Sequence, residues 1–73
     1  MRITCDPAAG AVYIHLTGAP LPPGRTTIQA SNPPGTQAFA ALDWKDDRLV
    51  GLEILDASSR PPPDLPGQAE IIS

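Results

Sequence analysis

The chain has 73 residues, which is enough for one small domain and too few for a second. Five basic residues against eight acidic residues give a net charge of −3, which argues against binding to the phosphates of nucleic acids or anionic membranes. One cysteine and one histidine exclude an internal disulfide framework, a cysteine-based metal cluster and a multi-histidine site within one chain. The longest apolar run, residues 38–42, is far shorter than the roughly 20 residues that span a bilayer.

No secretory signal is evident at the start of the sequence. The apolar stretch 8–14 is interrupted by Gly10 and stopped by His15, so it does not resemble the apolar region of a signal peptide. A lone thiol without such a signal is typical of a reducing compartment. We therefore expect a cytoplasmic protein.

The first readable unit is a β-hairpin. Residues alternate between apolar and polar in 2–6 and again in 11–16, which is the period of a β-strand. The link 7–10 opens with proline and closes with glycine, as a tight turn does. With these four residues as the loop, one face carries Ile3, Cys5, Val12 and Ile14, with Ile3 opposite Ile14 and Cys5 opposite Val12. Tyr13 and His15 then lie on the other face.

A second hairpin is predicted over residues 38–55. The three-residue loop 46–48 gives one wholly apolar face, whose pairs are Trp44 with Val50, Leu42 with Leu52 and Ala40 with Ile54. A two- or four-residue loop instead sets Asp43 against Val50 and buries its carboxylate, which is costly. We therefore expect the three-residue loop, with Asp43 and Glu53 on the face opposite the apolar one.

The remaining segments are short and rich in proline. A weaker strand is expected at 26–30, and at most one helical turn near residues 55–59. The predicted fold is all-β: a small antiparallel meander of four to five strands in one domain, residues 1–59. A proline-rich tail, residues 60–73, follows it, and the last residues, 69–73, either fray or add to a sheet edge.

One sheet of this size covers only one of its faces. The apolar residues that must be buried are Val12, Ile14, Leu16, Ile28, Leu42, Trp44, Val50, Leu52 and Ile54. No amphipathic helix is available to cover them, which leaves curling of the sheet, cover from the proline loops or a partner chain. A two-fold homodimer supplies a second layer most simply, so we expect self-association.

The two hairpins also carry a family resemblance. The matching blocks are Ile3-Thr4-Cys5-Asp6-Pro7, Val12-Tyr13-Ile14, Leu49-Val50-Gly51-Leu52-Glu53-Ile54-Leu55 and Ala57-Ser58. They resemble the bacterial YuzE-like family of small proteins, from which the chain departs by extra prolines and by Cys5, Gly10 and Asp47 where a Tyr, an acidic residue and a turn glycine are usual. The resemblance implies a compact antiparallel sheet and brings no established activity. Some members lie beside small toxin-like genes, which implies an interaction role.

Four side chains on the predicted non-core face are candidate binding residues: Tyr13, His15, Asp43 and Glu53. A histidine near carboxylates can act as a general acid or base. Asp43 and Glu53, together with Asp46 and Asp47, could also offer oxygen ligands to Ca²⁺ or Mg²⁺. The ordered ligand spacing of a calcium loop is absent, and nothing in the sequence places the two hairpins side by side. We therefore assign no catalytic residue, no metal ligand and no cofactor, and favour polar decoration of an exposed face or part of an interface, where Tyr and His are common.

Two further features have plain structural interpretations. Cys5 is expected to be a small buried hydrophobe, since no cation is predicted beside it. The segment 60–66 has the spacing of SH3-type ligands, but a stiff extended tail is the favoured interpretation.

These observations favour a small non-catalytic protein, an interaction or accessory module of an antitoxin-like kind, with a homodimer and a protein partner as its contacts. The alternative is a minimal metal-dependent hydrolase or metal-binding protein that uses the acidic residues and the histidine of the sheet face. An enzyme is the less favoured of the two.

Overall fold

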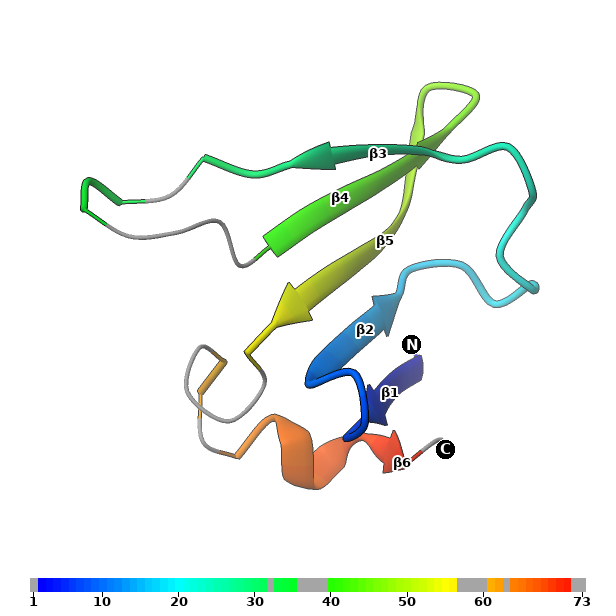
Figure 1. Ribbon diagram of the computed structural model, residues 1–73. Helices are drawn as coiled ribbons and strands as arrows, with labels where there is room; N and C mark the ends of the chain where they lie inside the picture. Colours follow the sequence, from blue (N-terminus) through cyan, green and yellow to red (C-terminus); the bar gives the residue numbers. More distant parts are fainter. Residues whose placement is uncertain (1, 32, 36–39, 57–60, 63, 72–73) are drawn as a thin grey trace.

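The computed structural model describes residues 2–31, 33–35, 40–56, 61–62 and 64–71, and its strands form one mixed sheet (Figure 1). The strands are β1 (Arg2–Asp6), β2 (Ala11–His15), β3 (Thr26–Gln29), β4 (Ala40–Lys45), β5 (Arg48–Leu55) and β6 (Glu70–Ile71). Their order across the sheet is β3-β4-β5-β2-β1-β6. β6 is parallel to β1, and the other neighbouring strands are antiparallel. A 3-10 turn, η1 (Pro66–Gln68), precedes β6.

The all-β class is confirmed, but the strand order is not a meander. The chain leaves β2 through the long loop 16–25, forms β3 at the far edge, and returns through β4 and β5, so that β5 pairs with β2. A loop of that length does not force its two strands to be neighbours. Pairing β2 with β5 places the two apolar strands at the centre and leaves the exposed β3 at the edge.

The end of the chain belongs to the sheet. β6 adds to the β1 edge as a sixth strand, which is the second of the two alternatives expected for residues 69–73. The helical turn expected near residues 55–59 falls mostly outside the described residues, as does part of the segment 60–66. Within the described residues, no helix is long and apolar enough to cross a membrane.

The first hairpin has the predicted register. Cys5 pairs with Val12 and Asp6 with Ala11 across the turn 7–10. Gly10 has a φ of +64°, the left-handed region that glycine enters without steric penalty. The Asp6 carboxylate accepts hydrogen bonds from the backbone N–H groups of the turn, at 3.1 and 3.4 Å, and so holds it closed.

The second hairpin closes differently from the prediction. Its turn has two residues, Asp46 and Asp47, with φ of 50° and 63°, as a type I′ turn requires. Trp44 therefore pairs with Leu49, and Val50 is an extra residue in β5, a β-bulge. The bulge restores the pairs predicted for the rest of the hairpin, which are Leu42 with Leu52 and Ala40 with Ile54. The two-residue turn and an apolar face are thus compatible, which the prediction did not allow.

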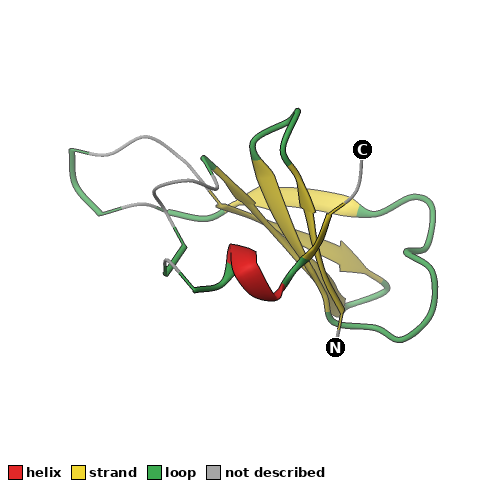
Figure 2. Cartoon of the chain, turned by 90° about the horizontal axis from the view of Figure 1, so that it is seen from below, coloured by secondary structure: helices red, strands yellow, loops and turns green. Residues whose placement is uncertain are grey.

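One face of the sheet, the apolar face, consists of two rows of residues paired across the strands. The rows are Ile28, Leu42, Leu52, Ile14, Ile3 and Ala40, Ile54, Val12, Cys5, Ile71. Val12 is fully buried and Cys5 is 8% exposed, whereas Ile28 is 52% exposed. Figure 2 shows that the strands form a single twisted layer. Of the ten residues in these rows, Ile28 and Ile71 are exposed, Val12 and Cys5 are buried, and the other six are partly exposed in a single chain.

Candidate functional site

The other face of the sheet, the polar face, brings the four candidate residues together. Its central rows are Thr27, Asp43, Gly51, His15, Arg2 and Ala41, Glu53, Tyr13, Thr4, Glu70. Tyr13 and Glu53 are cross-strand partners, while Asp43 and His15 flank Gly51 in the neighbouring row. The pairing of β2 with β5 therefore creates a cluster that neither hairpin forms alone.

Asp43 is the centre of this cluster. The hydroxyl of Tyr13 donates a hydrogen bond to Oδ2 at 2.6 Å, and the hydroxyl of Thr27 donates one to Oδ1 at 2.6 Å. The guanidinium Nε of Arg25 lies 3.5 Å from Oδ2. The carboxylate, only 8% exposed as a residue, thus has a partner on each oxygen and a positive charge beside it.

The protonation of Asp43 is set by these contacts. Burial acts to raise the pKa of its carboxyl group, but the hydrogen bonds from Thr27 and Tyr13 and the charge of Arg25 outweigh it. The pKa therefore lies below its ordinary value, and the group is an ionised, fully engaged carboxylate at neutral pH. Such a group holds β2, β3 and β4 together rather than acting as a free base.

Gly51 makes room for the Tyr13 side chain. A Cβ atom at Gly51 would collide with the hydroxyl and ring atoms of Tyr13, although the backbone there is ordinary extended strand. The absence of a side chain at Gly51 thus lets the phenol cross β5 and reach Asp43. This glycine is explained by the close approach of a side chain, which is one of the reasons for a glycine inside a strand.

His15 extends the cluster toward β1. Its Nε2 lies 3.2 Å from the hydroxyl of Thr4, a residue that is only 4% exposed, and its ring centroid lies 4.8 Å from that of Tyr13. Burial, together with the positive charge of Arg2, lowers the pKa of His15, so the ring is neutral at physiological pH. Burial and the hydrogen bond to Asp43 raise the pKa of Tyr13 to about 12. The Tyr13 hydroxyl therefore keeps its proton at neutral pH, whereas the neutral His15 ring is able to accept one.

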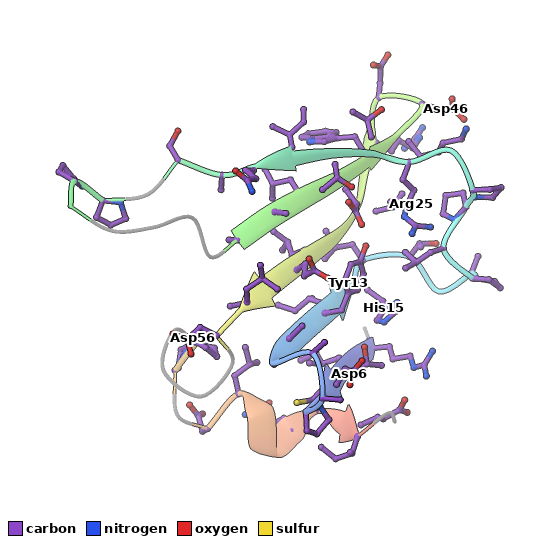
Figure 3. All side chains as sticks on the ribbon, viewed as in Figure 1. Asp6, Tyr13, His15, Arg25, Asp46 and Asp56 are labelled. Atoms are coloured by element: carbon purple, nitrogen blue, oxygen red, sulfur yellow. The ribbon has the colours of Figure 1, made fainter. Side chains whose placement is uncertain are left out.

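An open depression of about 450 Å³ lies over the cluster and is bordered by Leu21 and Arg25 of the loop 16–25. Figure 3 shows Arg25 near Tyr13 and His15. Glu53 and Asp6 also line it. Asp46 lies at the far turn of the second hairpin, away from Tyr13 and His15. In the described part of the chain, no three Asp, Glu, His or Cys side chains gather as metal ligands. The carboxylate site considered for Ca²⁺ or Mg²⁺ is therefore not assembled there.

Two members of the cluster, Arg25 and Thr27, did not emerge from the sequence. Alternation around Ile28 does place Thr27 on the polar face. Its partner could not be named, because that requires knowing that β3 pairs with β4 at this register. Arg25 precedes the strand and carries no pattern of its own.

Comparison of the chain with protein-family models, with curated proteins and with solved structures gives no match. The resemblance to the YuzE-like proteins therefore stays a prediction from the sequence, and the function has to be inferred from the geometry of the chain itself.

Proposed function

We propose that this protein is a non-catalytic interaction module that assembles as a two-fold homodimer through its apolar face. The exposure of that face is the observation that carries the proposal. Ile28 is 52% exposed, and Ile14, Leu42 and Leu52 in the same row are partly exposed. Apolar surface of this extent costs free energy in water, and burying it favours association.

The chain exposes more surface than an average folded monomer of its mass. The chain exposes 4999 Å², whereas a folded monomer of 7.6 kDa is expected to expose about 4,300 Å². The excess of about 700 Å² belongs to the whole surface, loops included, and is of the same order as the roughly 800 Å² per partner that a standard protein interface buries. The flat shape, 31 × 29 × 19 Å, fits the same interpretation, because two sheets stack about 10 Å apart.

Charge favours contact on this face and not on the other. Both rows of the apolar face are free of charged residues. Two copies with a net charge of −3 each can therefore meet there without placing like charges against each other. On the polar face, the Asp43 carboxylate is engaged by three partners and its pKa is lowered, while the pKa of its partner Tyr13 is raised to about 12. That arrangement supports a structural role for the cluster and a non-catalytic function for the protein.

Sedimentation equilibrium at about 20 μM tests the proposal, since micromolar association is within reach of an interface of this size. We expect a mass near twice 7.6 kDa for the natural chain. Leu52→Glu, which places a charge in the apolar face, should give the monomer mass. Glu53→Gln, at the next position on the opposite face, should keep the dimer. A monomer at both 20 and about 100 μM for the natural chain would overturn the proposal.

A variant that fails to fold is recognised by a second measurement. The melting temperature of the natural chain should rise with protein concentration, because unfolding of a dimer is linked to dissociation. Millimolar Mg²⁺, Ca²⁺ or Zn²⁺ should leave that temperature unchanged, whereas the alternative, a metal-dependent hydrolase or metal-binding protein, requires a rise. The accessory or antitoxin-like role rests on the family resemblance alone, and the cytoplasmic location on the lone thiol of Cys5.

A further inference from the structure

β3 is an open edge of the sheet. It stands at the end of the strand order, and among the described residues no strand lies beyond it (Figure 1). All four of its residues, Thr26–Gln29, are exposed. An edge strand presents a row of backbone N–H and C=O groups that can pair with another strand.

The pairing of β3 with β4 shows which groups face outward. The N–H of Ala30 donates to the C=O of Ala40 at 3.0 Å, which directs the backbone groups of Ala30 toward β4. Successive residues of a strand point their backbone groups to opposite sides, so Ile28 also faces β4. By the same alternation, the N–H and C=O groups of Thr27 and Gln29 face away from the sheet.

Three of the usual protections against edge pairing (proline, charge and a bulge) are missing from β3, which has four residues. Proteins shield such edges with proline, with charged residues, with bulges or with very short strands. The four residues of β3 include neither a proline nor a charge, and no bulge is present in its pairing with β4. The opposite edge differs, because β6 has only two residues and its Glu70 forms an ion pair with Arg2 at 2.8 Å.

We propose that β3 pairs antiparallel with β3 of a second copy, about a two-fold axis at Ile28. Thr27 then lies opposite the partner's Gln29, and each such pair exchanges both backbone hydrogen bonds. Ile28 meets the partner's Ile28 as a non-hydrogen-bonded pair, in which the side chains approach most closely. The sheets of the two copies join into one, and the row that begins at Ile28 continues across the join.

A second copy is the occupant that this edge fits best. The arrangement of outward groups is self-complementary, because the two residues that face outward lie symmetrically about Ile28. Ile28 is 52% exposed in the single chain and would be covered by its own counterpart. The segment 26–31 is uncharged, so a chain with a net charge of −3 meets its copy there without repulsion. This edge contact goes beyond the proposed function: it shares Ile28 with the apolar face, but it rests on the outward backbone groups of Thr27 and Gln29.

Gln29→Pro tests the edge contact with little effect on the chain's own sheet. Proline at this position removes an N–H that faces outward and blocks an incoming strand, while the hydrogen bonds from β3 to β4 remain. Gln29→Ala is the matched control, since it changes the side chain and keeps the N–H. Fluorescence of Trp44, which pairs with Thr26 of β3, reports whether the variant keeps its fold.

Two readouts are measured between about 20 and 500 μM. For the natural chain and for Gln29→Ala, we expect the average mass to rise with protein concentration. Over the same range, the hydrogen exchange of the backbone amides at positions 27 and 29 should slow several-fold, while the amide of Ile28 is protected at every concentration. For Gln29→Pro the rise in mass should be absent. Exchange at Thr27 and Gln29 that does not depend on concentration, or a folded Gln29→Pro variant that associates like the natural chain, would overturn the inference.

The same data separate this inference from the proposed function. If only the apolar face associates, Gln29→Pro keeps the dimer mass and the edge amides exchange freely at all concentrations. If only the edge associates, the natural chain dimerises with protection of the edge amides, Leu52→Glu behaves like the natural chain, and Gln29→Pro is a monomer.

Discussion

Gly51→Ala tests the interpretation of the polar cluster by the sign of its effect on the free energy of unfolding. An alanine inside a strand is ordinarily more stable than a glycine by about 0.5–1 kcal/mol, because glycine loses more conformational freedom on folding. The backbone at Gly51 is not in the left-handed region, so nothing in the main chain opposes the change. The added methyl group, however, would occupy the space of the Tyr13 phenol. Tyr13 must therefore leave Asp43.

The magnitude is set by the contact that is lost. The hydrogen bond from Tyr13 to the carboxylate of Asp43 is charge-assisted, and such bonds contribute about 1.5–3 kcal/mol. After the gain in strand preference, Gly51→Ala should lower the free energy of unfolding by about 1–2 kcal/mol. For a domain of this size the melting temperature should fall by roughly 5–15 °C.

Urea unfolding followed by the fluorescence of Trp44, at one fixed protein concentration, measures the effect. Tyr13→Phe should also destabilise, by about 1.5–3 kcal/mol. The double variant should cost clearly less than the two single changes together, because the same hydrogen bond is lost only once. A Gly51→Ala protein as stable as the natural chain would refute the role assigned to Gly51.

Three other outcomes are expected from the same structure. The single tyrosine, Tyr13, should ionise near pH 12 rather than at its ordinary pKa of 10.0, as followed by ultraviolet absorbance, and a midpoint near 10 would contradict this. The free energy of unfolding should fall between those two pH values, because the folded state keeps a proton that the unfolded state releases. Because the pKa of Asp43 is lowered in the folded state, its carboxylate contributes stability that is present above the ordinary pKa of 3.8 and is lost as the pH falls below that value. In acid denaturation, the free energy of unfolding of Asp43→Asn should therefore fall less steeply with decreasing pH than that of the natural chain. An unchanged dependence on pH would count against the hydrogen-bond network around Asp43. Asp47→Gly should raise the free energy of unfolding by about 0.5–1 kcal/mol, because Asp47 has a φ of 63° in a turn that prefers glycine at this position. Thermal unfolding measures the change, and a destabilised variant would contradict the prediction.

The first hairpin was predictable because two independent signals agree. Alternation and the turn residues Pro7 and Gly10 select the same register, and a shift by one residue would expose every apolar side chain. The turn of the second hairpin was not predictable by counting alone. The count assumed a regular ladder, whereas the bulge at Val50 shifts the register by one residue beside the turn.

Four residues of the candidate site were predictable from the sequence, but their proximity to one another was not. Strand alternation places Tyr13, His15, Asp43 and Glu53 on one face, and the structure has all four there. Whether they are neighbours depends on the pairing of β2 with β5, a long-range contact on which the local pattern is silent. The role of Thr27 depends in the same way on the position of β3 beside β4.

The emission of Trp44 reports most directly whether a second copy covers the apolar face. By strand alternation this single tryptophan shares the face with Leu42, and it is partly exposed in one chain. On dilution from about 100 μM, we predict that its emission shifts to longer wavelength over the same concentrations at which the sedimentation mass falls toward 7.6 kDa. A constant emission maximum together with the monomer mass at every concentration would contradict the claim.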